Sequence, residues 1–161
     1  MKRLLSILTL ALPFLGLTSC DDDKNNLPDV DFVLEVADAS YSGGELYVVQ
    51  GNTLKITSLS VVNKEQGKQA LIPYANYYWD YIHIFESVVA PYGCNIYISD
   101  EMPVGKHVLE IYAPVYAVDK SPAFSVLQYT VNVVASADDI PADGATSFTA
   151  HPGIQETDPS K

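Results

Sequence analysis

A cysteine thiol is a nucleophile once it loses its proton, and one of the two cysteines in this chain has an unusual setting. Cys20 ends the stretch Leu17-Thr18-Ser19-Cys20, after a strongly apolar segment, and three aspartates follow it at once. Three neighbouring like charges stay solvated. The thiol beside them is therefore a candidate for chemistry rather than for core packing.

The apolar segment before Cys20 has the pattern of a secretory signal peptide, which we place at residues 1–19. Lys2 and Arg3 precede an apolar run of about 14 residues, shorter than the ~20 that cross a membrane. A basic start, a short apolar run and small residues before a cut site are typical of such leaders. The alternative is a buried core helix, which Pro13 and Gly16 oppose because both weaken a helix interior.

The four residues 17–20 resemble a bacterial lipobox, in which an apolar residue and two small ones precede a cysteine. This resemblance implies that the Cys20 thiol takes a diacylglycerol and that cleavage leaves Cys20 as the first residue. Stable anchoring needs more than one acyl chain, such as palmitate, and a lipoprotein cysteine carries two or three. The lipid on Cys20 is then the membrane partner of this protein.

The acidic run Asp21, Asp22 and Asp23 has two interpretations. It is either a plain hydrophilic tether or a sorting signal, within a tether that we place at residues 20–29. An acidic run directly after the lipid cysteine resembles the surface-export signal of Bacteroidota lipoproteins. That resemblance implies an outer-membrane location facing the cell exterior.

The rest of the sequence offers few candidates for catalytic residues. Cys94 shares one strand face with Ile96 and Ile98, so we expect a small buried hydrophobe. The three histidines are scattered, and no catalytic motif with a known spacing is present. We predict no enzyme, no metal site and no cofactor. The weak alternative is calcium on loop carboxylates, namely Asp100, Glu101, Asp119, Asp138 and Asp139.

Charge excludes nucleic acid as a partner. Without Lys2 and Arg3 the chain keeps seven of its nine Lys and Arg against 20 Asp and Glu, a formal charge of −13. Such a surface repels phosphate backbones, and no basic stripe offsets it.

Period-two alternation predicts an all-β domain at residues 30–135. Phe32, Leu34 and Val36 share one face of such a segment, and β-branched and aromatic residues dominate the others. Turn residues separate the segments. We expect seven to eight strands in a β-sandwich, at roughly 30–37, 45–50, 53–62, 70–79, 81–87, 93–99, 106–117 and 123–134.

Residues 136–161 lose this periodicity. Asp, Pro, Gly, Ser and Thr dominate, which predicts a flexible acidic tail. The alternative is that Thr146 to Ala150 adds an edge strand to the sandwich.

Three segments resemble immunoglobulin-like and PKD-like domains of bacteria. GNTLKITSLSV at Gly51 resembles the second strand, NYYWDY at Asn76 the third strand with its central Trp, and PVGKHVLEIYA at Pro103 the sixth. The resemblance covers most of residues 30–135 and implies an immunoglobulin-like antiparallel β-sandwich. His107 stands where a Tyr is usual in that sixth strand.

Aromatic side chains are the most distinctive candidates for a binding site. Tyr77 and Trp79 alternate with Tyr78, so we expect the first two in the core. The candidates for an exposed ligand-binding patch are Tyr78, Tyr81 and Tyr92, because aromatic faces stack on sugar rings and anchor interfaces.

Leader, acidic run and domain together resemble a small Bacteroidota surface lipoprotein. Similar proteins occur in glycan-uptake systems, as spacers or glycan binders. The resemblance implies a lipid-anchored, non-enzymatic binding or spacer module with a glycan or protein partner. The alternative is a structural adhesin or assembly subunit that pairs through exposed strand edges.

Overall fold

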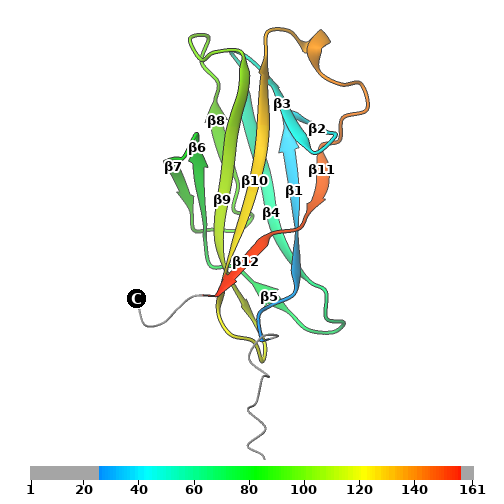
Figure 1. The fold of residues 1–161 in the computed structure, drawn as a ribbon, viewed down its shortest axis with the longest axis vertical. Helices are drawn as coiled ribbons and strands as arrows, with labels where there is room; N and C mark the ends of the chain where they lie inside the picture. The colour runs from blue at the N-terminus through cyan, green and yellow to red at the C-terminus, as the bar shows by residue number, and fades with distance from the viewer. Residues whose placement is uncertain (1–25, 157–161) are drawn as a thin grey trace, which may run out of the picture.

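The computed structural model describes residues 26–156. The predicted signal peptide, Cys20 and the aspartates 21–23 lie outside the described residues. The described chain forms two β-sheets packed face to face (Figure 1). Within residues 26–156 no helix is long and apolar enough to cross a membrane.

Six of the twelve described strands alternate buried and less buried positions along their length. Their bounds are β1 (Val30–Ala37), β2 (Ser40–Ser42), β3 (Glu45–Val49), β4 (Thr53–Asn63), β5 (Ala70–Leu71), β6 (Ala75–Trp79), β7 (Ile82–Ser87), β8 (Cys94–Tyr97), β9 (Gly105–Ala117), β10 (Ala123–Val134), β11 (Ser147–Ala150) and β12 (Gly153–Glu156), with a 3-10 turn η2 (Ala137–Asp139) before β11.

The smaller sheet has the order β11-β1-β4-β8, and the larger one β2-β3-β10-β9-β6-β7, with β12 on β10 and β5 on β9. Pairing is antiparallel except between β3 and β10, which run parallel. The chain therefore starts in one sheet with β1 and crosses to the other with β2 and β3. This arrangement confirms the immunoglobulin-like β-sandwich and places the three resembling segments on β4, β6 and β9.

The core lies between the sheets and is formed by the side chains that the strands turn inward. Phe32 and Leu34 of β1 and Leu109 and Ile111 of β9 belong to this layer, and all four are fully buried. Burial of a large apolar side chain contributes roughly 1.5–3 kcal/mol, so the packed layer supplies most of the driving force for folding. Trp79 is also buried, at 8% exposure, which confirms its predicted place in the core.

The predicted strand at 70–79 is divided in the structure. β5 ends at Leu71 and β6 begins at Ala75, with Pro73 between them. Proline has no N–H to donate to a sheet ladder and confines itself to strand ends and edges. The sequence pattern continued through this proline because the residues on both sides of it are apolar or aromatic.

The prediction of a flexible tail from residue 136 is wrong for the part that the structure describes. β11 pairs with β1, placing Phe148 opposite Leu34 and Ala150 opposite Phe32. Phe148 is buried and stacks on Tyr41 with ring centroids 3.8 Å apart. The alternative of an edge strand at 146–150 is therefore correct. Two inward residues are too few to show a period in sequence.

The packing of Phe148 yields a first prediction. Phe148→Ala should lower the free energy of unfolding by roughly 3–5 kcal/mol, because it removes a buried ring and leaves a cavity. The measurement is chemical unfolding of the chain from residue 21 onward. Thr149→Ala is the matched control, since Thr149 is the exposed neighbour on the same strand. Equal, small effects of the two changes would contradict the docking of β11.

Candidate functional site

The structure separates the three tyrosines predicted to form an exposed patch. Tyr78 lies on the outer face of β6, and Tyr81 lies in the turn before β7 with 68% of its surface exposed. Tyr92 is half-buried against the core. Its hydroxyl donates to the Ile72 carbonyl at 2.7 Å, and its own carbonyl accepts from the Tyr77 hydroxyl. Through these bonds Tyr92 holds the loop before β8 against the core.

Tyr78 belongs instead to an aromatic group on the outer face of the larger sheet. Its ring meets Tyr112 of β9 and His83 of β7 edge to face, each with centroids 5.1 Å apart. The three residues come from adjacent strands, since β6 pairs with β9 on one side and β7 on the other. Tertiary pairing thus assembles rings that are separated in sequence.

Polar side chains on the same face flank these rings. Glu110 lies opposite Tyr78 in the strand register and is only 8% exposed, although it is on the solvent side of the sheet. One of its oxygens accepts from the Gln128 amide at 3.1 Å. We call Tyr78, His83, Glu110, Tyr112 and Gln128 the outer-face cluster.

The outer-face cluster combines ring surfaces with hydrogen-bonding groups. Burial raises the pKa of Tyr112, and the nearby Glu110 carboxylate and Tyr78 act in the same direction. Tyr112 therefore stays a neutral phenol that can donate or accept a hydrogen bond. Rings beside a carboxylate and an amide suit a ligand with apolar C–H faces and several hydroxyls.

Sequence reasoning missed Glu110, Tyr112 and Gln128 as site residues. Their outward position follows from alternation along β9 and β10. Their proximity to Tyr78 depends on the order β10-β9-β6, which no local pattern encodes.

His107 occupies the position where the resemblance expects a tyrosine. Its Nδ1 lies 2.7 Å from Oδ2 of Asp80, and its Nε2 lies 2.9 Å from the Pro103 carbonyl. The ring also stacks on Trp79 with centroids 5.3 Å apart. The contact with a carbonyl four residues upstream is of the kind that a tyrosine corner makes with its hydroxyl.

These contacts make His107 structural rather than catalytic. Carboxylate and carbonyl oxygens both accept, so the two contacts together favour the doubly protonated ring. No ring nitrogen is left to act as a base. Burial alone would lower the pKa of His107, but the hydrogen bonds to Asp80 and the Pro103 carbonyl outweigh it, and the pKa is raised.

The other candidate nucleophile and bases lie in separate places. His83 contacts the Asn76 side chain at 3.1 Å, and His151 contacts Asp31 at 2.6 Å. Cys94 is buried, as predicted, and burial raises its pKa to about 11, which keeps the thiol protonated. Among residues 26–156, no three His, Cys, Asp or Glu side chains are grouped to hold a metal ion.

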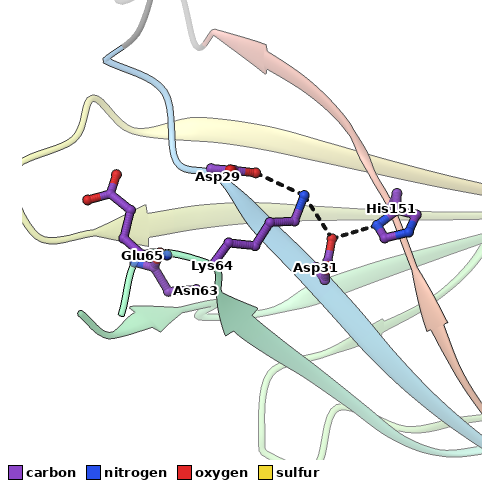
Figure 2. A network of polar contacts seen from close by, with 6 residues as sticks. All are labelled: Asp29, Asp31, Asn63, Lys64, Glu65 and His151. Atoms are coloured by element: carbon purple, nitrogen blue, oxygen red, sulfur yellow. Dashed lines mark hydrogen bonds and ion pairs between the residues drawn. The ribbon is translucent and has the colours of Figure 1, made fainter. Parts of the chain in front are cut away.

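A polar network marks the end of the sandwich where the described chain begins (Figure 2). Lys64 bridges Asp29 and Asp31 at 3.0 and 3.2 Å, and His151 joins through Asp31. Burial alone would raise the pKa of Asp31, but hydrogen bonds from His151 and Lys64 outweigh it and lower the pKa. We call this end, with Asn26 and the β9–β10 turn, the N-terminal pole.

Asn26 is fastened to that turn by two hydrogen bonds. Its carbonyl accepts from the Ser121 N–H at 2.9 Å, and its side-chain amide donates to the Ser121 hydroxyl at 3.0 Å. The first described residue, Asn26, is therefore already bonded to the body of the sandwich.

Comparison with known proteins gives little beyond the fold. No family model matches the chain, and no curated protein matches it. Among solved structures, the fibronectin(III)-like modules of Clostridium thermocellum CbhA match with 18% identity and a TM-score of 0.35. The match covers 61% of this chain and 94% of that one. A likeness of this extent has no bearing on function.

The geometry of His107 predicts a pH dependence of stability. Because the folded pKa is raised, the stabilisation is complete below about pH 6.5, the ordinary pKa of histidine, and is lost as pH rises through the folded pKa. The measurement is thermal unfolding of the chain from residue 21 onward at several pH values. His107→Phe should keep the stack on Trp79 and lose this dependence.

His83→Phe is the matched control, because His83 is exposed. It should retain the loss of stability above about pH 6.5 that the unmodified chain shows. Identical pH profiles for the unmodified chain and His107→Phe would contradict the assignment.

Proposed function

We propose that this protein is a lipid-anchored, cell-surface, non-enzymatic binding or spacer module that takes part in glycan capture or uptake. The observation that carries the proposal is the lipobox-like stretch that ends at Cys20. Asn26, six positions later, is hydrogen-bonded to Ser121 at the N-terminal pole. A lipid on Cys20 would hold the sandwich by that end. The long axis in Figure 1 would then project the rest of the domain away from the membrane.

The outer-face cluster supports a binding role. It lies on the exposed face of the larger sheet, where Tyr78 and Tyr112 meet edge to face and Glu110 and Gln128 supply polar groups. A saccharide offers both C–H faces for the rings and hydroxyls for the carboxylate and amide. We therefore assign the glycan contact to this cluster rather than to Tyr81 or Tyr92.

A second candidate function is that of an adhesin or assembly subunit that pairs through strand edges. The observation in its favour is the apolar edge strand β7, which is exposed at five of its six positions. This function is compatible with the same lipid anchor.

The anchor is tested by Cys20→Ser in the full chain. We expect the change to abolish lipid labelling and to release the protein from the membrane fraction, or to stall it with its leader attached, because serine offers no thiol to carry the diacylglycerol. Replacing Asp21, Asp22 and Asp23 together by alanine is the matched comparison. That variant should keep its lipid and, if the acidic run is a sorting signal, become less accessible to external protease.

Normal leader cleavage and membrane fractionation of Cys20→Ser would contradict the lipid anchor. Unchanged protease access of the alanine variant would favour the plain tether over the sorting signal. The two results are independent of the fold.

The binding face is tested on a glycan array with the chain from residue 21 onward. Where a glycan binds, Tyr112→Ala should weaken it by about 30-fold, because truncating an anchoring ring typically costs about 2 kcal/mol or more. Tyr116→Ala is the matched control, since Tyr116 lies further along β9 and is exposed. Equal affinities of the two variants would exclude the outer-face cluster as the glycan site.

A further inference from the structure

The edge strand β7 carries an unusual concentration of exposed apolar residues. It pairs only with β6 and ends the larger sheet. At six residues it is longer than the other strands that end the two sheets, β8 and β11 with four each and β2 with three. Of the twelve large apolar side chains exposed in the described part of the chain, six lie between Tyr81 and Val89.

The inner face of β7 is uncovered because the two sheets differ in width. The smaller sheet ends at β8, and a groove of about 570 Å³ opens between β7 and β8. Phe85 lines this groove with Ile56 and Cys94, and is 47% exposed. An apolar side chain placed beside Phe85 would lose contact with water.

β7 lacks the residue types that usually protect an edge strand. Lysine, proline and strong charge on an exposed edge are among the devices that prevent pairing with another chain. The stretch from Tyr81 to Val89 contains no lysine and no proline, and its ionisable residues other than Tyr81 are His83 and Glu86. The edge is thus open to an added strand.

A β-bulge interrupts the alternation of inward and outward side chains along β7. Tyr77 pairs with Phe85 and Tyr78 with His83, which leaves Ile84 as the extra residue. The residues of β7 opposite buried positions of β6 are Ile82, Phe85 and Ser87, and those opposite outward positions are His83 and Glu86. The inward and outward positions of β7 are therefore arranged symmetrically about the peptide bond between Ile84 and Phe85.

This arrangement makes the strand complementary to itself. If β7 pairs antiparallel with a second β7 about a two-fold axis between Ile84 and Phe85, each Ile84 lies opposite the other Phe85. Each His83 lies opposite the other Glu86, which places an imidazole beside a carboxylate on the outer side. Inward residues meet inward residues, and no like charges meet.

We propose that two copies of this chain associate through β7, forming one continuous sheet across a two-fold axis between Ile84 and Phe85. A closed two-fold contact uses the same surface on both copies, as a self-complementary strand requires. The Phe85 rings of the two copies lie together over the uncovered grooves. This goes beyond the proposed anchor and glycan site, and it specifies the edge pairing of the second candidate function.

The orientation of the pair follows from the strand direction. β7 runs roughly along the long axis of the sandwich (Figure 1), and the two strands are antiparallel. The N-terminal poles of the two copies therefore point in opposite directions. For molecules held at that pole, such a contact would join two facing surfaces.

The test is the oligomeric state of the chain from residue 21 onward, measured by sedimentation over a wide range of concentration. We expect a monomer–dimer equilibrium, which Ile84→Lys shifts to monomer at every concentration because it places two ammonium groups at the axis. Val118→Lys is the matched control, since Val118 is an exposed apolar residue outside β7. It should dimerise as the unmodified chain does.

The register is tested with single cysteines. His83→Cys mixed with Glu86→Cys should form a disulfide-linked dimer, whereas either variant alone should not, because only the mixed pair lies directly opposite. Cys94 is buried and Cys20 lies outside the tested chain, so neither interferes. A charge exchange adds a second readout: His83→Glu should prevent dimerisation, and His83→Glu with Glu86→His should restore it.

A monomer at the highest concentration would overturn the proposal. A dimer that survives Ile84→Lys, or that links His83→Cys to itself, would overturn the strand or the register. These outcomes require neither lipid nor glycan, so they are independent of the tests of the anchor and of the outer-face cluster.

Discussion

The structure depends on one constraint: a strand that lines the core must turn one face inward, and six of the described strands bury every second side chain. β1 and β10 show it most clearly, because their buried positions alternate over nearly the whole strand. A shift of one residue in either would turn Phe32 or Leu127 toward solvent and bring polar side chains into the core. The strand register is therefore held by hydrophobic burial, and the outward positions remain available for binding.

Side-chain hydrogen bonds help to hold the loops and strand ends in place. Tyr77 and Tyr92 join β6, the loop before β8 and the Ile72 carbonyl in one chain of contacts. At the other end of β6, Asp80 binds the Val108 N–H at 2.9 Å as well as His107. Both sets flank β6, which keeps Tyr78 in place for the outer-face cluster.

The unequal width of the sheets has two consequences for function. The larger sheet presents a broad outer face on which Tyr78, Tyr112 and Glu110 converge from adjacent strands. It also ends in β7, whose inner face has no strand opposite it. The proposed glycan contact rests on the first of these features, and the proposed pairing of two copies rests on the second.

The sequence by itself predicted the longer strands and several buried side chains, because a local residue pattern encodes both. Strand alternation identified β1, β4, β9 and β10, and it placed Trp79 and Cys94 inside. It did not identify β2 and β12 and gave β11 only as an alternative, because elements of three or four residues have too few inward positions to show a period. The signal peptide and the lipid on Cys20 stay predictions from the sequence, since the described residues begin at Asn26.

Only the tertiary structure decided which outward residues meet. The partners of Tyr78 on the outer face lie on β7 and β9, and the sheet order that joins them arises from long-range pairing. The inward turn of Tyr92 and the pairing of His107 with Asp80 have the same origin. Alternation determines which side of a strand a residue faces, whereas the packing of distant strands determines what it touches there.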